Sequence, residues 1–267
     1  MPTAELTART RFARDLARDA GALALDWFRR RGELAVEAKG PQDWVSAADR
    51  AVEAHVRDAL CAAFPGDAML GEESGGELGD RLWVVDPIDG TLNFLHGVRY
   101  WCVSIAFVAG DRREIGVIHD PCQDELFWAQ RGAGAWCGDE RIAVSGCEAL
   151  DRALVAAGHV PRHPLELHLA TRAALLRAGA AVKDMGAGAL MLAHVAAGRF
   201  DGFVEPHMHP WDAAAGLTLV EEAGGRVLPY PGTGGLAAGG RVIASAPGLY
   251  AALAAVAASC GAGQDPT

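Results

Sequence analysis

The chain has 267 residues, of which 51 % are hydrophobic and 22 % are charged, and its formal net charge is −10. These values are ordinary for a soluble globular protein and allow one large domain or two smaller ones. An acidic chain is repelled by nucleic acid and by anionic membranes, so neither is expected as its main partner. An acidic protein that handles an anionic substrate needs local positive charge, which bound cations can supply.

The cysteines and the N-terminus favour a cytoplasmic protein. The six cysteines are scattered, without a C-x-x-C pair or the spacing of a zinc site, and we interpret them as reduced thiols. No stretch approaches the roughly 20 apolar residues that a membrane helix needs. The charged N-terminal segment has no apolar run after it, so no signal peptide is expected.

The N-terminal part is expected to hold two helices. The first is indicated by apolar residues at helical spacing, which are Phe12, Leu16, Leu23 and Trp27. This helix is predicted to end at Gly32. A second helix is predicted to begin after Ser46, with Asp49 three positions on as the acid of a capping box.

Strands and further helices are predicted to follow. Residues 82–85 are apolar throughout, as in a strand buried on both faces, and residues 101–144 have the pattern of an antiparallel meander. Beyond Cys147, alanine-rich helices alternate with short strands, as in a layered α/β unit. These helices are expected at 168–177, 189–197, 213–223 and 250–258. We therefore predict two halves, residues 1–146 and 147–267, with the active site at their boundary.

The strongest chemical signal is the segment VDPIDGTLNF at 85–94. The apolar strand delivers Asp86 to its C-terminal end. A tight turn between Pro87 and Gly90 is then expected to hold Asp89. Two carboxylates three residues apart repel each other unless a cation lies between them. Oxygen ligands of this kind suit Mg²⁺, which keeps several waters and also binds phosphate oxygens.

The same turn offers groups for a phosphate. The Ile88 carbonyl is a further candidate oxygen ligand, and the N–H groups of Gly90 and Thr91 lie at the start of a short helix, where anions bind. The alternative is that Asp86 and Asp89 are ordinary turn and N-cap residues. Because both directly follow an apolar strand, we favour the metal site.

Three further acids are candidates. Glu72, in LGEES after a strand, can bridge metals and orient a water, or it can belong to a solvated acidic turn. Asp212 opens the helix of WDAAAG and can be a metal ligand or a plain N-cap. Asp49 can likewise be only the acid of its capping box.

The motifs G-E-E-S, D-P-I-D-G-T-x-N-F and W-D-x-A-A-G, in this order, resemble those of the inositol monophosphatase superfamily. The resemblance runs from about Lys39 to Gly225. It implies an α+β fold layered as an αβαβα sandwich, with a mainly antiparallel sheet and two helices in the N-terminal half. It also implies a homodimer and a Mg²⁺-dependent, lithium-sensitive phosphatase that acts on a small phosphomonoester through a metal-activated water.

The resemblance also implies roles for single residues. The implied ligands of two or three Mg²⁺ ions are Glu72, Asp86, the Ile88 carbonyl, Asp89 and Asp212. Asp49 would lie beside a weakly held third metal, and Lys39 near the metal cluster. Thr91 would orient the attacking water together with Glu72. The residues implied around the substrate are Asp89, Gly90, Thr91, Gly186, Ala187, Glu205 and Asp212.

Specificity is expected to depend on the C-terminal half. Glu205 matches the position where sugar-phosphatase members bind substrate hydroxyls, although it can also be a strand-end acid. We interpret His207 and His209 as rim or substrate contacts rather than metal ligands, because Mg²⁺ prefers oxygen. Ala187 stands where the family usually has a hydroxyl. An inositol-phosphate-like substrate is favoured, with histidinol phosphate as the alternative.

Two other functions are weighed. The segment Asp89-Gly90-Thr91 is similar to that of haloacid-dehalogenase phosphatases, but those need an aspartate where this chain has Pro87. Some bacterial members of the inositol monophosphatase superfamily act in RNA-linked regulation. The charge of −10 and the absence of a basic stripe argue against this as the main role.

Overall fold

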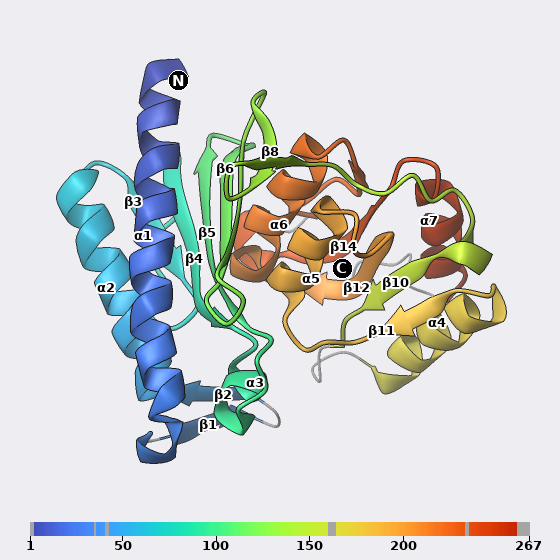
Figure 1. The fold of residues 1–267 in the computed structure, drawn as a ribbon, viewed down its shortest axis with the longest axis horizontal. Helices are drawn as coiled ribbons and strands as arrows, with labels where there is room; N and C mark the ends of the chain where they lie inside the picture. Colours follow the sequence, from blue (N-terminus) through green and yellow to red (C-terminus); the bar gives the residue numbers. More distant parts are fainter. Residues whose placement is uncertain (1–2, 35, 41–42, 160–163, 233–234, 261–267) are drawn as a thin grey trace.

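The structure is a computed structural model that describes residues 3–34, 36–40, 43–159, 164–232 and 235–260 (Figure 1). At residue 33 and in 36–40 and 43–45 the description covers the backbone alone. The helices are α1 (Thr3–Arg29), α2 (Ala47–Ala63), α3 (Thr91–His96), α4 (Leu165–Arg177), α5 (Gly188–Ala196), α6 (Pro210–Glu222) and α7 (Tyr250–Ser259). None of these described helices is both long and apolar enough to cross a membrane.

A seven-stranded sheet forms the N-terminal part. Its strands are β3 (Ala68–Gly71), β4 (Arg81–Asp89), β5 (Cys102–Ala109), β6 (Arg112–Asp120), β7 (Glu125–Gln130), β8 (Gly134–Cys137) and β9 (Glu140–Ile142). They lie side by side in chain order; β3 pairs with β4 in parallel, and every later pair is antiparallel. The predicted meander is therefore confirmed.

A five-stranded sheet forms the C-terminal part. Its strands are β10 (Leu154–Ala157), β11 (Ala181–Lys183), β12 (Gly202–Met208), β13 (Arg226–Val227) and β14 (Gly240–Ser245). In the order β11-β10-β12-β14-β13, the first two pairs are parallel and the last two are antiparallel. The division of the chain into subdomains at residues 1–146 and 147–267 stays a prediction.

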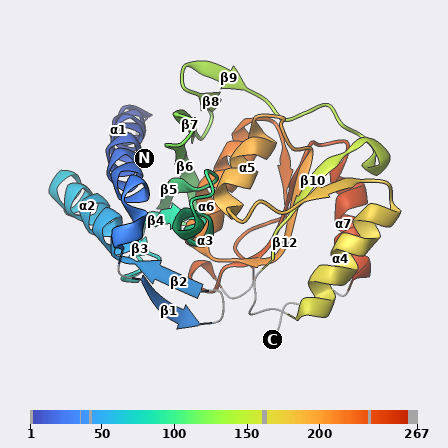
Figure 2. The same ribbon diagram turned by 60° about the horizontal axis from the view of Figure 1, so that its bottom comes forward.

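The helices and sheets form five layers (Figure 1). Helices α1 and α2 cover one face of the seven-stranded sheet, α5 and α6 lie between the two sheets, and α4 and α7 cover the far face of the five-stranded sheet. Three apolar cores fill the spaces between these layers. A hairpin of β1 (Val36–Gly40) and β2 (Asp43–Ser46) lies beside α3 (Figure 2). The predicted αβαβα sandwich is confirmed.

The first helix packs through small residues. Its fully buried side chains include Ala13, Ala17, Ala20 and Ala24, whereas Phe12 and two other apolar residues of the predicted stripe are only partly buried. Small side chains let the helix approach the sheet closely. The spacing of the large apolar residues predicted the helix correctly, but the face that is buried is the neighbouring one, which carries the alanines.

Strand β4 carries two of the candidate acids. Its residues from Leu82 to Asp89 are all buried, because α1 and α2 cover one face of the sheet and α6 covers the other. The strand continues through Asp89, which pairs with Cys102, and its register is irregular after Asp86. The prediction that a tight turn holds Asp89 is therefore wrong. Gly90, with φ of 94°, ends the strand and caps α3.

Helix α6 lies directly on the seven-stranded sheet. A Cβ atom on Gly116 of β6 would lie 2.3 Å from the Ala215 carbonyl oxygen, so the strand needs glycine at this crossing. The Ser104 hydroxyl of β5 donates to the Trp211 carbonyl at 3.0 Å and holds the first turn of the helix. These contacts bring Asp212, in the same turn, to the end of β4.

Candidate metal and phosphate site

Three aspartates converge between the two sheets. Asp86 and Asp89 come from the end of β4, and Asp212 comes from the first turn of α6. Each offers a carboxylate oxygen, and these oxygens all lie within 4.8 Å of one another. An all-oxygen group of this size and charge is the donor set that Mg²⁺ prefers.

Burial raises the pKa values of Asp86 and Asp89. Burial, followed by the charges of Glu72, Asp89 and Asp212, holds the pKa of Asp86 well above its usual range. Burial raises the pKa of Asp89 to about 6, although backbone N–H groups at the start of α5 stabilise its charged form. A cation among these groups would compensate both effects.

Glu72 adds a fourth carboxylate. It follows β3 directly, and its N–H donates to the Val85 carbonyl of β4 at 3.2 Å. Its side chain forms a hydrogen bond with that of Asp86. Glu72 also lines the cavity described below, so the alternative of a solvated acidic turn away from the site does not hold.

Asp49 combines its predicted capping role with a contact to the site. Its Oδ2 atom accepts from the Ser46 backbone N–H at 2.8 Å and from the Ser46 hydroxyl, which confirms the capping box. Its Oδ1 atom lies 3.2 Å from Thr91 Oγ1, which is also 3.1 Å from the Ile88 carbonyl oxygen. Burial raises the pKa of Asp49. Lys39 belongs to β1, and its side chain lies outside the described residues.

A cavity of about 220 Å³ opens beside the acids. Every residue that the family resemblance implies around the substrate lines it. The residues in its wall are Glu72, Asp86, Ile88, Asp89, Gly90, Thr91, Leu92, Gly158, His159, Asp184, Gly186, Ala187, Gly188, Met191, Glu205, Met208 and Asp212.

Several lining residues were missed from the sequence. Gly158 and His159 follow β10, and Asp184 follows β11. These two parallel strands end at the same edge of the five-stranded sheet, so their loops meet at the cavity. No local motif identifies these residues. Only the order of the strands in the sheet predicts that their loops lie at the site.

Glu205 faces the cavity from β12. It is 7 % exposed, and a Cβ atom on Gly158 would lie 2.0 Å from its Oε2 atom, so glycine makes room for the carboxyl group. Burial, followed by the charges of Asp212 and Asp184, holds the pKa of Glu205 well above its usual range. Among the described residues no hydrogen-bond partner is found for its carboxyl group, and Glu205 lines the cavity.

The two halves are joined through hydrogen bonds at the site. Asp89 accepts the N–H groups of Gly188 at 3.0 Å and Leu190 at 3.2 Å, both in the first turn of α5. Asn93 of α3 donates from Nδ2 to the carbonyl groups of Tyr100 at 2.8 Å and Met185 at 2.7 Å. These bonds fix the 186–188 segment against the end of β4.

The histidine pair lies outside the cavity wall. His207 Nε2 lies 2.8 Å from the Ala238 carbonyl oxygen, and the His209 ring stacks on Trp211 with centroids 4.6 Å apart. Their interpretation as rim or substrate contacts stays a prediction. The His209 N–H donates to Asp212 Oδ2 at 3.3 Å, so Asp212 also caps its helix, from the third helical position.

Comparison with known proteins decides the family. The model of the inositol monophosphatase family matches residues 5–262. The chain belongs to this family. The motif-based resemblance is thereby confirmed over nearly the whole chain.

Relatives agree in sequence and in structure. The chain is 40 % identical over 246 residues to a Pseudomonas aeruginosa protein named Nus factor SuhB, covering 89 % of this chain and 91 % of that protein. It is 41 % identical over 217 residues to the inositol-1-monophosphatase of Rhizobium meliloti, covering 79 % of each. The Thermotoga maritima IMPase structure matches with a TM-score of 0.86 and 33 % identity, covering 95 % of this chain and 98 % of that one.

Replacing Asp212 by asparagine separates its role as a helix cap from its role as a metal ligand. An asparagine keeps an oxygen for the His209 N–H but removes one charge from the acid cluster. We expect Asp212→Asn to raise the melting temperature of the metal-free protein and to weaken Mg²⁺ binding about tenfold or more, as measured by calorimetry.

Asp120→Asn is the matched control. Asp120 is also a buried acid whose pKa burial raises to about 6, and one of its oxygens accepts the N–H groups of Cys122 and Gln123. It lies outside the cavity wall and should leave Mg²⁺ affinity unchanged. Wild-type Mg²⁺ affinity in Asp212→Asn would mean that Asp212 is only a helix cap.

Proposed function

We propose that this protein is a Mg²⁺-dependent phosphatase that hydrolyses a small phosphomonoester with water as the nucleophile. The observation that carries the proposal is the convergence of Asp86, Asp89 and Asp212 on the wall of one cavity, with their oxygens within 4.8 Å. Relatives named inositol-1-monophosphatase support it. A homodimer and a cytoplasmic location belong to the same proposal by family resemblance.

The donor set fits Mg²⁺. The cluster offers only carboxylate oxygens, with the Ile88 carbonyl in the same cavity wall. We assign the ligands of two or three ions to the set Glu72, Asp86, the Ile88 carbonyl, Asp89 and Asp212. Bound Mg²⁺ supplies positive charge that makes water more acidic and that balances charge on the phosphate and on the leaving oxygen.

The chain's own residues orient the water and the phosphate. A Thr91 hydroxyl that donates to Asp49 or to the Ile88 carbonyl keeps its lone pairs free to accept a hydrogen bond from the attacking water. Glu72, on the same cavity wall, accepts the second hydrogen of that water. The backbone N–H groups of Gly90 and Thr91 bind the phosphate at the start of α3, and Lys39 would add positive charge.

The leaving group is proposed to lie against Glu205. Glu205 is buried and lines the cavity, and its carboxyl oxygens can accept hydrogen bonds from the hydroxyl groups of a polyol such as inositol. Histidinol phosphate would instead need a charged carboxylate for its ammonium group. We therefore favour an inositol-1-phosphate-like substrate, with histidinol phosphate as the alternative.

A second function is favoured by the names of several relatives. Proteins 34–40 % identical to this chain are named Nus factor SuhB, which supports the RNA-linked regulatory role found in some bacterial members of the family. The net charge of −10 disfavours direct binding to RNA. Retention of RNA at physiological salt, without phosphate release from any small phosphomonoester, would favour this second role.

Metal dependence tests the proposed activity. Purified protein should release phosphate from inositol-1-phosphate with Mg²⁺, lose this activity in excess EDTA, and regain it when Mg²⁺ is restored. Millimolar Li⁺ should lower the rate, as the family resemblance implies. Asp86→Asn, prepared in the same way, controls for contaminating phosphatases. Full activity in excess EDTA would contradict the proposal.

The Glu205→Gln variant tests the substrate. Glutamine still donates to and accepts from hydroxyls, so kcat/KM for inositol-1-phosphate should fall only mildly. A charge-assisted bond contributes about 1.5–3 kcal/mol, so histidinol phosphate should lose about ten- to a hundredfold. An aryl phosphate without hydroxyl groups serves as the control and should be unaffected. Higher wild-type kcat/KM for histidinol phosphate, with a collapse for that substrate alone, would overturn the polyol preference.

A further inference from the structure

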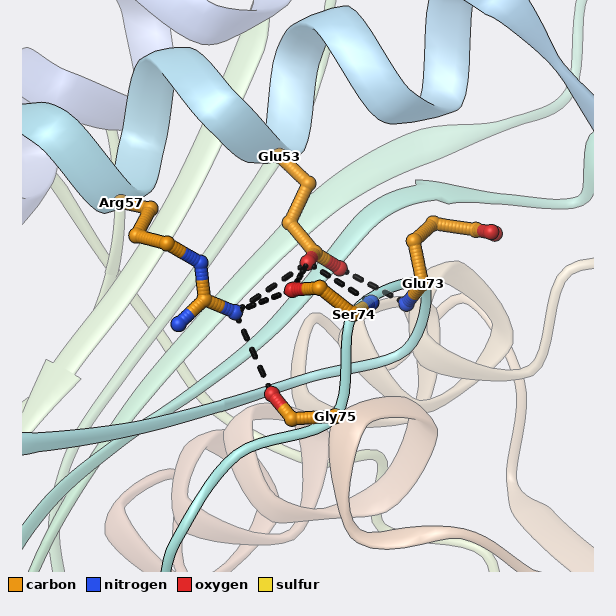
Figure 3. Close-up of polar contacts among 5 residues, drawn as sticks. All are labelled: Glu53, Arg57, Glu73, Ser74 and Gly75. Carbon is orange, nitrogen blue, oxygen red and sulfur yellow. Dashed lines mark hydrogen bonds and ion pairs between the residues drawn. The ribbon is translucent and has the colours of Figure 1, made fainter.

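The turn that carries Glu72 is held by a glutamate from another element. Figure 3 shows Glu53 and Arg57 of α2 directed at the backbone of residues 73–75, while the Glu73 side chain points away from them. Glu53 is 2 % exposed and is separated by about 20 positions from the turn that it contacts. None of the motifs in the sequence includes it.

One carboxylate receives four donors. Glu53 Oε2 accepts the Glu73 N–H at 2.8 Å, and Oε1 accepts the Ser74 N–H at 3.0 Å as well as the Ser74 hydroxyl. Arg57 Nη2 donates to Glu53 Oε1 at 3.2 Å, to the Ser74 hydroxyl, and to the Gly75 carbonyl at 3.2 Å (Figure 3). The arginine thus joins the carboxylate to the far end of the turn.

The approach of Glu53 is close and specific. A Cβ atom on Gly71 would lie 2.4 Å from Glu53 Oε2, so a larger residue where β3 enters the turn would displace the Glu53 carboxylate. Gly71 and Gly75 also exchange two backbone hydrogen bonds, of 3.0 and 3.1 Å, which close the turn without Glu53. Glu53 therefore does not close the turn but fixes the position of the backbone between Gly71 and Gly75.

We propose that Glu53 is a positioning residue for the Mg²⁺ site, which it serves by holding Glu72 against Asp86. The inference rests on the proposed function, because it takes Glu72 as a ligand. Repulsion from the neighbouring aspartates destabilises the position of the Glu72 side chain beside Asp86 when no cation is present. The bonds from Glu53 to the next two residues oppose this movement and keep the ligand in place for the ion.

Glutamine cannot replace this carboxylate. A glutamine side chain at this position would place an NH₂ group where one of the two oxygens now lies. Its least unfavourable orientation keeps Oε1 for three donors and turns the NH₂ group toward the Glu73 N–H, where two donors face each other. The turn would then loosen at the residue directly after Glu72, with little change in side-chain volume.

The experiment compares Glu53→Gln with a matched control in the full-length chain. Glu222 of α6 also accepts two backbone N–H groups of a turn, those of Gly132 and Gly134, each at 2.9 Å, and it lies outside the cavity wall. Glu222→Gln therefore removes the same kind of contact without touching the acid cluster. Mg²⁺ affinity is measured by calorimetry, and amide hydrogen exchange is measured on the metal-free proteins.

We expect the Mg²⁺ dissociation constant of Glu53→Gln to rise about tenfold or more, within the range seen for residues that orient metal ligands. Amide protection at Glu73 and Ser74 should fall, and excess Mg²⁺ should restore most of kcat. Glu222→Gln should bind Mg²⁺ like the wild type. If Glu53→Gln does not fold, Arg57→Met, which alters a partly exposed side chain, should weaken Mg²⁺ binding in the same direction.

Equal Mg²⁺ dissociation constants in the wild type, Glu53→Gln and Arg57→Met would overturn the inference and leave Glu53 a structural residue. If the wild type binds Mg²⁺ and hydrolyses phosphomonoesters in that case, only this inference fails. A wild type that binds no Mg²⁺ overturns both the inference and the proposed function.

Discussion

Electrostatic repulsion among acids that the fold buries together is the constraint on which the rest of the structure depends. Asp86 and Asp89 share the end of one buried strand, while Asp212 and Glu72 reach them from a helix and a turn. Removing carboxylates from water disfavours their charged forms, and placing them side by side disfavours these forms further. The arrangement therefore lowers the stability of the metal-free protein and favours the binding of a cation.

The same acids also hold the architecture together. Asp89 accepts two N–H groups from the start of α5, and Asp212 accepts an N–H at the start of its own helix. Each of these two aspartates thus has a structural partner and still contributes to the cluster. The site lies where the end of β4 meets the first turns of α5 and α6, so an ion bound there would strengthen the contact between the two halves of the chain. Binding and folding are coupled in such an arrangement.

Local patterns predicted what is local in the structure. An apolar run followed by two aspartates identified the buried strand and its acids, and the spacing of Ser46 and Asp49 identified a capping box. Three features depend on distant parts of the chain and were not predictable in this way. The spacing of large apolar residues does not reveal the close packing of Ala17 against a sheet. His159 reaches the cavity only because of the order of the strands. Glu53 binds the backbone of a turn about 20 positions away in the sequence.

The stability of the metal-free protein as a function of pH tests the central claim most directly. The pKa of Asp89 is about 6 in the folded state, against about 4 in an unfolded chain. The folded protein therefore holds this proton more tightly, and the resulting contribution to the free energy of unfolding is complete below pH 4 and is lost as the pH rises through 6. In excess EDTA the melting temperature should fall between pH 5 and 7.5, and saturating Mg²⁺ should remove most of that fall. A melting temperature that stays level or rises over this range in EDTA, and that Mg²⁺ does not change, would contradict the account.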